Sequence, residues 1–271
     1  MNFSKIKVAY FSAAGTTQKV ACHIANTLSK TLHLPIEGCD FTLPQQRQDP
    51  LAFKADELVV FGTPVYAGRV PNVLLKYLAT MQAEGAKALA VVVYGNRDYD
   101  DALMELSDIL SNAGAQVFAA GAFIGEHSFS YTLAAGRPDK DDLEKIEAFA
   151  GQVAGKVKAN NFSKPEIKGT PYPYRQHFQP HNEQGQPFDI RKVKPITTEA
   201  CIACGVCASV CPMGSISTSD YKEIAGICIK CGACIKRCPR HAKQFVDANY
   251  LFHKEDVERK NQRRAEAEWF V

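Results

Sequence analysis

Hydrophobic residues in the first 160 positions alternate between short apolar runs and helical spacings. Runs bounded by Gly, Pro, Asn or Ser predict buried parallel strands at residues 7–11, 58–62, 88–94 and 116–124, with a weaker one near 34–37. Apolar residues three or four apart predict helices around residues 20–28, 73–80, 99–113 and 141–159. This alternation predicts an α/β domain with a parallel sheet covered by helices on both faces.

The pattern changes after residue 160. Residues 161–195 contain six prolines interleaved with aromatic residues such as Tyr172, Tyr174 and Phe178. We interpret this segment as a linker that lies on the protein surface, because aromatic side chains usually cover apolar surface. We therefore expect a domain at 1–160, a linker at 161–195, a smaller domain at 196–247 and a helical tail at 248–271.

Composition and charge add limits to this picture. Apolar residues make up 46% and charged residues 23% of the 271 positions, which is typical of globular proteins. The longest apolar run, residues 88–94, is too short to span a membrane, and the first residues do not resemble an export signal. We expect a cytoplasmic protein with no membrane partner. The ten cysteines then indicate metal or redox chemistry rather than disulfides.

Eight of those cysteines form an internal repeat. The pattern C-x2-C-x2-C-x3-C-P begins at Cys201 and again at Cys228, 27 residues later. It is the pattern of bacterial ferredoxins with two [4Fe-4S] clusters, in which the fourth cysteine of each run binds the other cluster. Zinc is the alternative, but zinc sites usually pair one C-x2-C with a distant second pair. We therefore expect one cluster on Cys201, Cys204, Cys207 and Cys238, and another on Cys228, Cys231, Cys234 and Cys211.

A loop of small residues follows the first predicted strand and leads directly into a helix. Such a loop can place N–H groups and hydroxyls around a phosphate at the positive end of the helix. It lacks the lysine of an ATP-binding loop and the three glycines of a dinucleotide-binding loop, so a phosphomonoester fits better. Simple capping of the helix is the alternative. The residues are Ser12, Ala13, Ala14, Gly15, Thr16 and Thr17.

Two further loops complete a resemblance to flavodoxins. Gly-Thr-Pro-Val-Tyr-Ala-Gly ends at Gly68, and Tyr-Gly-Asn-Arg-Asp-Tyr ends at Tyr99. The resemblance implies a doubly wound five-stranded parallel sheet of order 2-1-3-4-5, with FMN held by the three loops. Ala14 departs from the flavodoxin pattern, which has a hydroxyl residue there. The implied FMN residues in these two loops are Thr63, Pro64, Val65, Tyr66, Ala67, Gly68, Tyr94, Gly95, Asn96, Arg97 and Tyr99.

Among them, Tyr66 and Tyr94 are the candidate rings beside the flavin, and the alternative for each is packing within its own loop. The flavodoxin domain is expected to be followed by a small α+β ferredoxin domain. As a whole, the chain resembles the flavodoxin–ferredoxin fusion proteins of anaerobes. The resemblance implies FMN and two [4Fe-4S] clusters in one protein, and hence electron transfer between them.

We predict an oxidoreductase that takes electrons from a redox partner protein, a ferredoxin or a reductase, and reduces a small-molecule acceptor. A non-enzymatic electron carrier is the alternative, and a redox sensor ranks last. No nucleic-acid-binding motif accompanies the clusters, and the excess of +5 charges in residues 161–271 is explained by the negative charge of the clusters. The oligomeric state stays open, with a homodimer as one option.

Reduction of an acceptor requires a proton source. Glu126 and His127 follow the fifth predicted strand and so lie at the binding edge of the sheet. His127 is expected to titrate near pH 7 and to act with Glu126 as the catalytic pair. The alternative is a surface loop with an incidental histidine.

Overall fold

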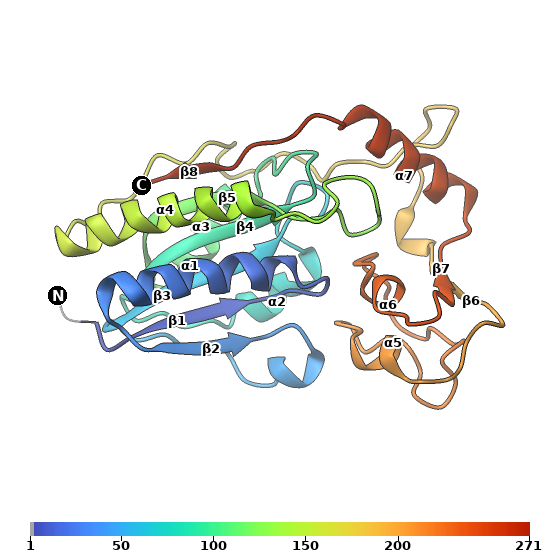
Figure 1. Cartoon of the computed structure of the whole chain (residues 1–271), viewed down its shortest axis with the longest axis horizontal. Helices are drawn as coiled ribbons and strands as arrows, with labels where there is room; N and C mark the ends of the chain where they lie inside the picture. Colours follow the sequence, from blue (N-terminus) through green and yellow to red (C-terminus); the bar gives the residue numbers. More distant parts are fainter. Residues whose placement is uncertain (1–2) are drawn as a thin grey trace.

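The N-terminal part of the chain forms a parallel sheet, as seen in a computed structural model that describes residues 3–271. The five parallel strands lie in the order β2-β1-β3-β4-β5, which confirms the predicted order (Figure 1). Every strand ends at the same edge, so the loops that follow them meet there. The strands are β1 (Lys5–Tyr10), β2 (Ile36–Asp40), β3 (Glu57–Pro64), β4 (Lys87–Tyr94) and β5 (Gln116–Ile124).

Helices cover both faces of this sheet. Helices α1 (Thr16–Leu32) and α4 (Lys140–Lys158) pack on one face, and α3 (Ala102–Asn112) packs on the other (Figure 1). The helix expected at 73–80 is instead a 3-10 turn, η2 (Asn72–Leu74), followed by the single turn α2 (Leu75–Leu78). Each face has its own core of fully buried aliphatic and aromatic side chains, so the sheet is rigid enough to position its loops.

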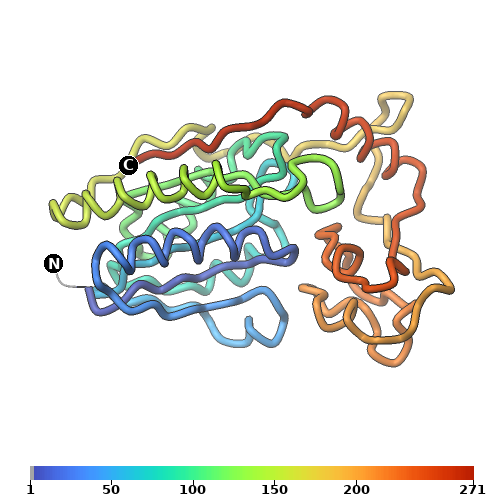
Figure 2. Tube along the Cα trace, viewed as in Figure 1, coloured from blue at the N-terminus to red at the C-terminus, as the bar shows by residue number. Residues whose placement is uncertain are grey.

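The end of the chain adds a sixth strand that the sequence did not indicate. After α7 (Ala248–Lys260), the chain runs back along the first domain, and β8 (Glu268–Phe270) pairs with β5 in antiparallel orientation (Figure 2). Trp269 in β8 donates a hydrogen bond from Nε1 to Oε1 of Gln152 on α4, at 3.1 Å. The tail is therefore a helix followed by an edge strand, and it ties the end of the chain to the first domain.

The cysteine-rich segment is small and nearly free of regular structure. Strands β6 (Ile196–Thr197) and β7 (Lys243–Gln244) form a two-stranded antiparallel ladder. Helices α5 (Val206–Ser209) and α6 (Ala233–Lys236) are single turns that follow the equivalent glycines of the two motifs. This segment lies beyond the carboxyl ends of the parallel strands (Figure 1).

The segment between the two parts runs over the first domain. Arg175 donates from Nη2 to Oδ1 of Asp101, at 2.7 Å, and Tyr174 donates from its hydroxyl to Oδ2 of Asp108, at 2.8 Å. The segment contains the 3-10 turn η3 (Ile190–Lys192). A second 3-10 turn, η1 (Pro44–Arg47), belongs to the first domain and follows β2. Two aspartates of the first domain, Asp101 and Asp108, thus hold this segment in place.

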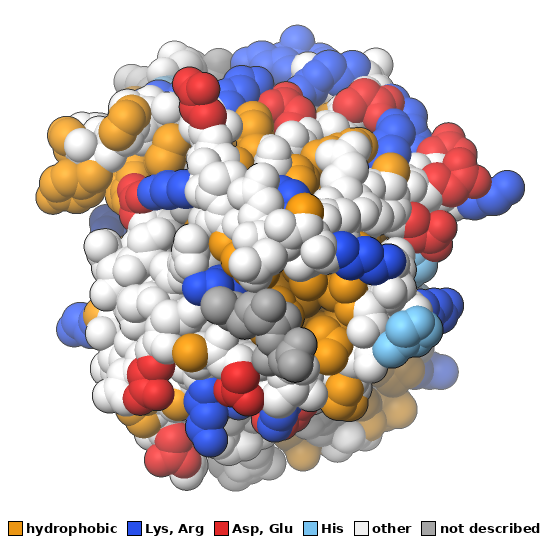
Figure 3. Space-filling model, turned by 90° about the vertical axis from the view of Figure 1, so that its left-hand side faces the viewer, with side chains coloured by type: hydrophobic (Ala, Val, Ile, Leu, Met, Phe, Trp, Pro, Cys, Tyr) orange, Lys and Arg blue, Asp and Glu red, His pale blue; other side chains and the backbone are white. Residues whose placement is uncertain are grey.

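The opposite end of the molecule lies away from the carboxyl ends of the parallel strands (Figure 1). Figure 3 shows this end, with basic and acidic side chains interspersed around a small hydrophobic area. Within residues 3–271, no helix combines the length and apolar character needed to cross a bilayer.

Candidate functional site

The loop after β1 lies at the edge of a cavity and leads directly into α1. Ser12 is buried; its N–H donates to Oγ1 of Thr42 and its Oγ accepts from the N–H of Gln18, both at 2.9 Å. Helix α1 begins after Gly15 (φ 94°) with no side-chain cap at that position. Among the described residues, the hydroxyls of Thr16 and Thr17 have no hydrogen-bond partner. The loop therefore offers unpaired donors at a helix N-terminus, as phosphate binding requires.

An inner cavity lies directly against this loop. It is formed by the segments that follow β1, β3, β4 and β5, so all four contribute from the same edge of the sheet. Its lining residues are Ala13, Ala14, Thr16, Thr17, Pro64, Val65, Tyr66, Val93, Tyr94, Gly95, Gly125, Glu126, His127 and Ser128.

A central cavity of about 840 Å³, including its open mouth, continues from the inner one. The two cavities share wall residues, among them Tyr66, Tyr94 and His127. Residues from the linker, the second cysteine motif and α7 close the central cavity, and these are Phe178, Pro180, Ile190, Ile229, Lys230, His253 and Val257. Four separate parts of the chain thus build one cavity.

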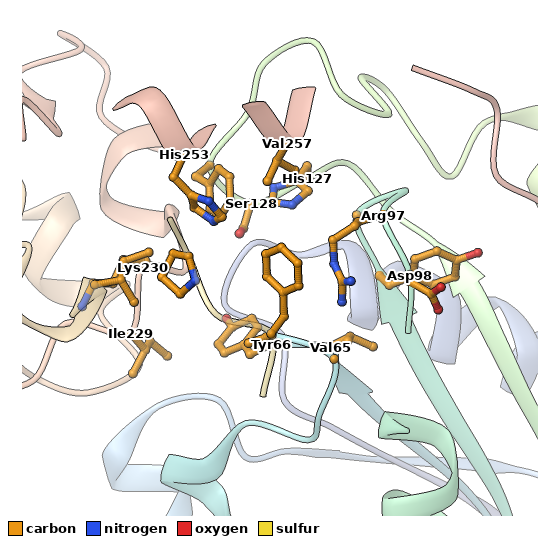
Figure 4. A pocket seen from close by; sticks show the side chains of 18 residues that line it. Val65, Tyr66, Arg97, Asp98, His127, Ser128, Ile229, Lys230, His253 and Val257 are labelled. Atoms are coloured by element: carbon orange, nitrogen blue, oxygen red, sulfur yellow. The ribbon is translucent and has the colours of Figure 1, made fainter. Parts of the chain in front are cut away.

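Figure 4 shows how the labelled side chains surround this space. His127 and His253 lie on one side and Tyr66 and Val65 on the opposite side, with Lys230 and Arg97 at the two flanks. Most of the wall is apolar, and a few polar groups point into it, as in sites for flat organic ligands.

Two buried polar atoms in this region have no partner among the described residues. They are Oγ1 of Thr63, at the end of β3, and Nδ1 of His127. Thr63 lines neither cavity, whereas His127 lines both, so the unpaired Nδ1 of His127 is the atom that is open to a ligand. Together with the open hydroxyls of Thr16 and Thr17 at the N-terminus of α1, this atom would fit the polar groups of a flavin mononucleotide.

Twelve of the residues expected to hold FMN line these cavities, and five do not. Ser12 and Gly15 shape the first loop, and Thr63 lies behind the cavity wall. Asn96 donates from Nδ2 to the carbonyl oxygens of Asn261 and Arg263, so it binds the C-terminal tail. Tyr99 donates its hydroxyl hydrogen to Glu268 at 2.7 Å, with the same effect. The residues that line the cavities are Ala13, Ala14, Thr16, Thr17, Pro64, Val65, Tyr66, Ala67, Gly68, Tyr94, Gly95 and Arg97.

The two expected aromatic neighbours of the flavin differ in their surroundings. Tyr94 packs on Tyr99 with ring centroids 5.6 Å apart, and its hydroxyl donates to the carbonyl of Glu266. Burial raises the pKa of Tyr94 to about 12. Tyr66 has no hydrogen bond from its hydroxyl among residues 3–271. Burial, and next the nearby thiols of Cys231 and Cys228, raise the pKa of Tyr66 well above its ordinary value.

The expectation that His127 titrates near pH 7 is not met. Burial lowers the pKa of His127 to about 3, and the positive charge of Lys236 acts in the same direction. Its ring packs on Phe129, with centroids 4.1 Å apart. His127 is therefore neutral at pH 7 and can exchange a hydrogen bond with a ligand but does not arrive with a proton to donate.

Glu126 also differs from the expected role. Its Oε1 accepts a hydrogen bond from Nζ of Lys236 at 2.5 Å, and its Oε2 accepts from the N–H of Gly136. Burial raises the pKa of Glu126, but these two hydrogen bonds outweigh burial and hold the pKa below its ordinary value. Glu126 is thus an ionised partner of the cysteine-rich segment.

The eight motif cysteines surround two further cavities. One is lined by Cys201, Cys204, Cys207 and Cys238, and the other by Cys211, Cys228, Cys231 and Cys234. These sets have the composition of the two expected ligand sets, with the fourth cysteine of each run beside the other loop. Four thiols in each set are the donors that a [4Fe-4S] cluster takes.

The two cysteine motifs have matching local geometry. The fourth cysteine of each run accepts a backbone hydrogen bond from four residues ahead: Ser215 N to Cys211 Sγ at 3.4 Å, and Ala242 N to Cys238 Sγ at 3.2 Å. Hydrogen bonds to sulfur favour the thiolate that binds iron. Burial raises the pKa of Cys231 and of Cys234 to about 12, so iron must displace the thiol protons there.

The second motif touches the flavin-site loops directly. A Cβ on Gly232 (φ 72°) would lie 2.1 Å from the carbonyl oxygen of Ser128, so the two backbones meet in a way only glycine permits. Lys236 donates to the carbonyl of His127 at 2.7 Å as well as to Glu126. Arg47 holds the other side by donating to the carbonyl of Pro212, at 2.6 Å.

Comparison with known proteins agrees with this division. Residues 7–127 match the family model of the flavodoxin domain, and residues 194–217 and 225–247 each match a model of a 4Fe-4S binding domain. No curated protein sequence matches the chain.

Several solved structures are similar to part of the chain. A flavodoxin from the domain Archaea is 17% identical, over 57% of this chain and 99% of its own, with a TM-score of 0.39. A flavodoxin of Streptococcus pneumoniae TIGR4 is 21% identical, over 56% of this chain and 99% of its own, with a TM-score of 0.40. A flavone reductase is 8% identical, over 59% of this chain and 65% of its own, with a TM-score of 0.42.

The sheet order, the loops at its carboxyl edge and the paired cysteine motifs define an electron-transfer protein of the flavin and iron–sulfur class. The chain is a flavodoxin-like domain joined to two 4Fe-4S ferredoxin motifs, the arrangement of a flavodoxin–ferredoxin fusion.

Sequence reasoning did not find the cavity residues outside the flavodoxin-like loops. Phe178 belongs to a segment whose aromatic residues indicated a buried surface but no site, and His253 belongs to no motif. A signal did exist for Lys236. The spacer before the fourth cysteine reads Ala-Ser-Val in the first motif and Ile-Lys-Arg in the second, and Lys236 of the second binds Glu126.

Proposed function

We propose that this protein relays electrons between two [4Fe-4S] clusters and FMN and uses them to reduce a small acceptor. The observation that carries the proposal is that residues of the flavodoxin-like loops and of the second cysteine motif line the same central cavity. Ile229 and Lys230, which lie between Cys228 and Cys231, form part of the same cavity as Tyr66 and Tyr94. A cluster on the second motif would therefore be next to the flavin, with no other domain between them.

The residues suited to each group follow from the cavities. The loop 12–17 would hold the FMN phosphate, and Val65, Tyr66, Tyr94 and Gly95 would line the ring site. The eight motif cysteines would hold the clusters in the two sets that line the cysteine cavities. When bound, each cluster exchanges one electron and the flavin exchanges two, which converts single-electron delivery into two-electron chemistry.

The chain itself would hold the clusters and the flavin close to each other and exclude water from the space between them. Lys236, bound to Glu126 and to the carbonyl of His127, fixes the second motif against the loop after β5. Phe178, from the linker, packs on the guanidinium of Arg97 at 4.4 Å and closes one side of the cavity. His127 would offer Nδ1 as a hydrogen-bonding atom to the flavin or to the acceptor.

An enzyme is favoured over a carrier by the walls of the central cavity. A carrier needs an exposed flavin edge and no substrate pocket, whereas here linker and α7 residues extend the cavity beyond the flavodoxin-like loops. The carrier keeps one observation in its favour. Ile202 and Ile227, beside Cys201 and Cys228, are 59% and 63% exposed, and exposed apolar side chains next to the cysteines could contact a redox partner protein.

An anaerobic reductive titration of the full chain tests the relay. We expect about eight irons and one FMN per chain and the uptake of about four electrons, two by FMN and one by each cluster. Uptake near two electrons without a flavin absorbance change contradicts the FMN assignment.

A second measurement separates the enzyme from the carrier. A catalytic amount of the chain is supplied with an excess of a low-potential reductant and mixed with small conjugated carbonyl compounds or quinones, and separately with an oxidised ferredoxin, and the rate without the chain is subtracted. Multiple turnovers with a small acceptor support the enzyme. Turnover with the ferredoxin alone supports the carrier and contradicts the enzyme.

A further inference from the structure

The inner cavity contains no cation to balance a phosphate group. Of the described residues that line it, Glu126 is the only one whose side chain is charged at pH 7, and that charge is negative. His127 is neutral there. A phosphate monoester carries about −1.5 to −2 charges at pH 7. The N-terminus of α1 offsets only part of that, since a helix end is equivalent to roughly half a charge.

A cation from outside the flavodoxin-like domain lies at the edge of the loop formed by residues 12–17, which precedes α1. A Cβ placed on Gly15 would be 3.7 Å from Nη2 of Arg237, which follows α6 in the second cysteine motif. Among residues 3–271, the Arg237 guanidinium has neither an ion pair nor a hydrogen bond. Its side chain is exposed, so it can turn onto an anion without giving up another partner.

The comparison of the two motifs singles out the same residue. Lys236 and Arg237 stand where the first motif has Ser209 and Val210. Lys236 is already engaged, since it binds Glu126 and the carbonyl of His127. Arg237 is the basic residue of this pair that has no partner in the described part of the chain, and it is the one that lies next to Gly15.

We propose that Arg237 binds the phosphate of FMN across the boundary between the two parts, so that the ferredoxin-like segment completes the flavin site. This inference rests on the proposed function, which supplies the FMN. A planar guanidinium suits a phosphate because it donates two parallel hydrogen bonds. Because Arg237 comes from the other segment, FMN binding and docking of that segment favour each other.

Binding of FMN and of riboflavin to the full chain, with its clusters intact and its flavin removed, tests the proposal. Riboflavin has the same ring system and no phosphate. In Arg237→Gln we expect the Kd of FMN to rise roughly tenfold or more, because a hydrogen bond to a charged group is lost, and the Kd of riboflavin to stay unchanged. Quenching of flavin fluorescence under anoxic conditions measures both constants. Arg237→Lys keeps the charge and should lie between the wild type and Arg237→Gln.

The matched control is Lys30→Gln, which removes one positive charge at the far end of α1. It should leave both constants unchanged. Iron content confirms that each variant keeps its clusters. If Arg237→Gln weakens FMN and riboflavin equally, Arg237 acts only through docking and the inference is wrong; unchanged FMN binding overturns it as well. A wild-type chain that binds neither flavin refutes the proposed function itself.

Discussion

The two halves of this molecule are stabilised in different ways. The flavodoxin-like domain has a core on each face of its sheet, built from fully buried residues such as Phe61, Phe118 and Phe149. In the ferredoxin-like segment, α5 and α6 are four residues long and β6 and β7 are two residues long. Helices and strands this short are not stable alone.

The difference assigns separate tasks to the halves. The first can present preformed loops because its core does not depend on a ligand. The second needs its clusters as cross-links, because metal binding supplies the folding free energy that a small core lacks. Where they meet, Gly232 and Lys236 hold the second motif against Ser128 and Glu126. The predictions that follow separate the contributions of the two halves.

Removal of iron should have the largest effect. After chelation, we expect residues 196–247 to lose their protection against proteases almost completely, while the flavodoxin-like domain stays folded. Trp269 is the only tryptophan and lies in β8 of the large sheet, so its fluorescence reports on the first half alone. A shift of Trp269 fluorescence in parallel with iron loss contradicts this division.

Asp101→Asn should release the linker. Asp101 is fully buried and accepts hydrogen bonds from Thr170 N and from the backbone and side chain of Arg175. We expect a loss of about 1–2 kcal/mol in stability and faster proteolysis within residues 161–195. Asp108→Asn is the control, since Asp108 is more exposed, accepts one hydrogen bond, from Tyr174, and forms only a long ion pair with Lys164, at 3.9 Å. Asp108→Asn should reduce stability and speed up proteolysis less than Asp101→Asn does. Equal effects of the two substitutions would contradict the role given to the buried Asp101.

The same carboxyl group has a defined pH dependence. Burial raises the pKa of Asp101, but the hydrogen bonds from Arg175 and Thr170 outweigh it and lower the pKa to about 2. The unfolded chain binds this proton near pH 3.9. The contribution of Asp101 is therefore complete above about pH 4 and is lost as the pH falls toward 2. Asp101→Asn should remove this part of the acid dependence of linker proteolysis.

The smallest effect concerns His127. Its pKa is lowered to about 3 by burial, against about 6.5 in the unfolded chain, so the unfolded state binds more protons between these values. This group should lower the free energy of unfolding by roughly 1 kcal/mol between pH 8 and pH 5.5. Urea unfolding followed by Trp269 fluorescence measures it, and His127→Gln should lack that component. An identical pH dependence in both proteins argues against a buried, neutral His127.

The sequence predicted most of each half but little of their contact. Apolar runs predicted the strands, because strand burial is a local property, and the sheet order came from the resemblance of the loop motifs to flavodoxins. The spacing of the cysteines predicted the two cluster-binding motifs. Strand β8 was missed because three residues, Glu268–Phe270, show no periodicity, and their pairing partner lies almost 150 positions earlier.

The candidate site was predicted only in part, because some of its residues belong to local motifs and others do not. The loop residues facing the cavity came from local motifs, whereas Phe178, Lys230 and His253 reach it only through tertiary contacts. The role expected of His127 changed because its burial depends on Phe129 and Lys236, which no sequence pattern places beside it.

The most direct test of the account compares two equivalent glycines. Gly232 and Gly205 precede α6 and α5, and both have left-handed backbones. A Cβ on Gly232 would meet the Ser128 carbonyl at 2.1 Å, whereas a Cβ on Gly205 would meet only the hydroxyl of Tyr221, at 3.1 Å. Alanine at either position carries the same backbone strain, but only Gly232→Ala pushes the second motif away from the flavin-site loops.

The measurement is the rate at which the flavin absorbance changes after the full chain, loaded with FMN, is mixed anaerobically with a reduced ferredoxin. We predict a rate several times lower in Gly232→Ala than in Gly205→Ala, since electron transfer slows as the donor and the acceptor are moved apart and only the alanine at 232 collides with the Ser128 carbonyl. FMN is added to saturation so that its occupancy is equal in both variants, and iron content should be equal as well. Equal rates in the two variants would contradict the claim that electrons pass between the second motif and the flavin across this contact.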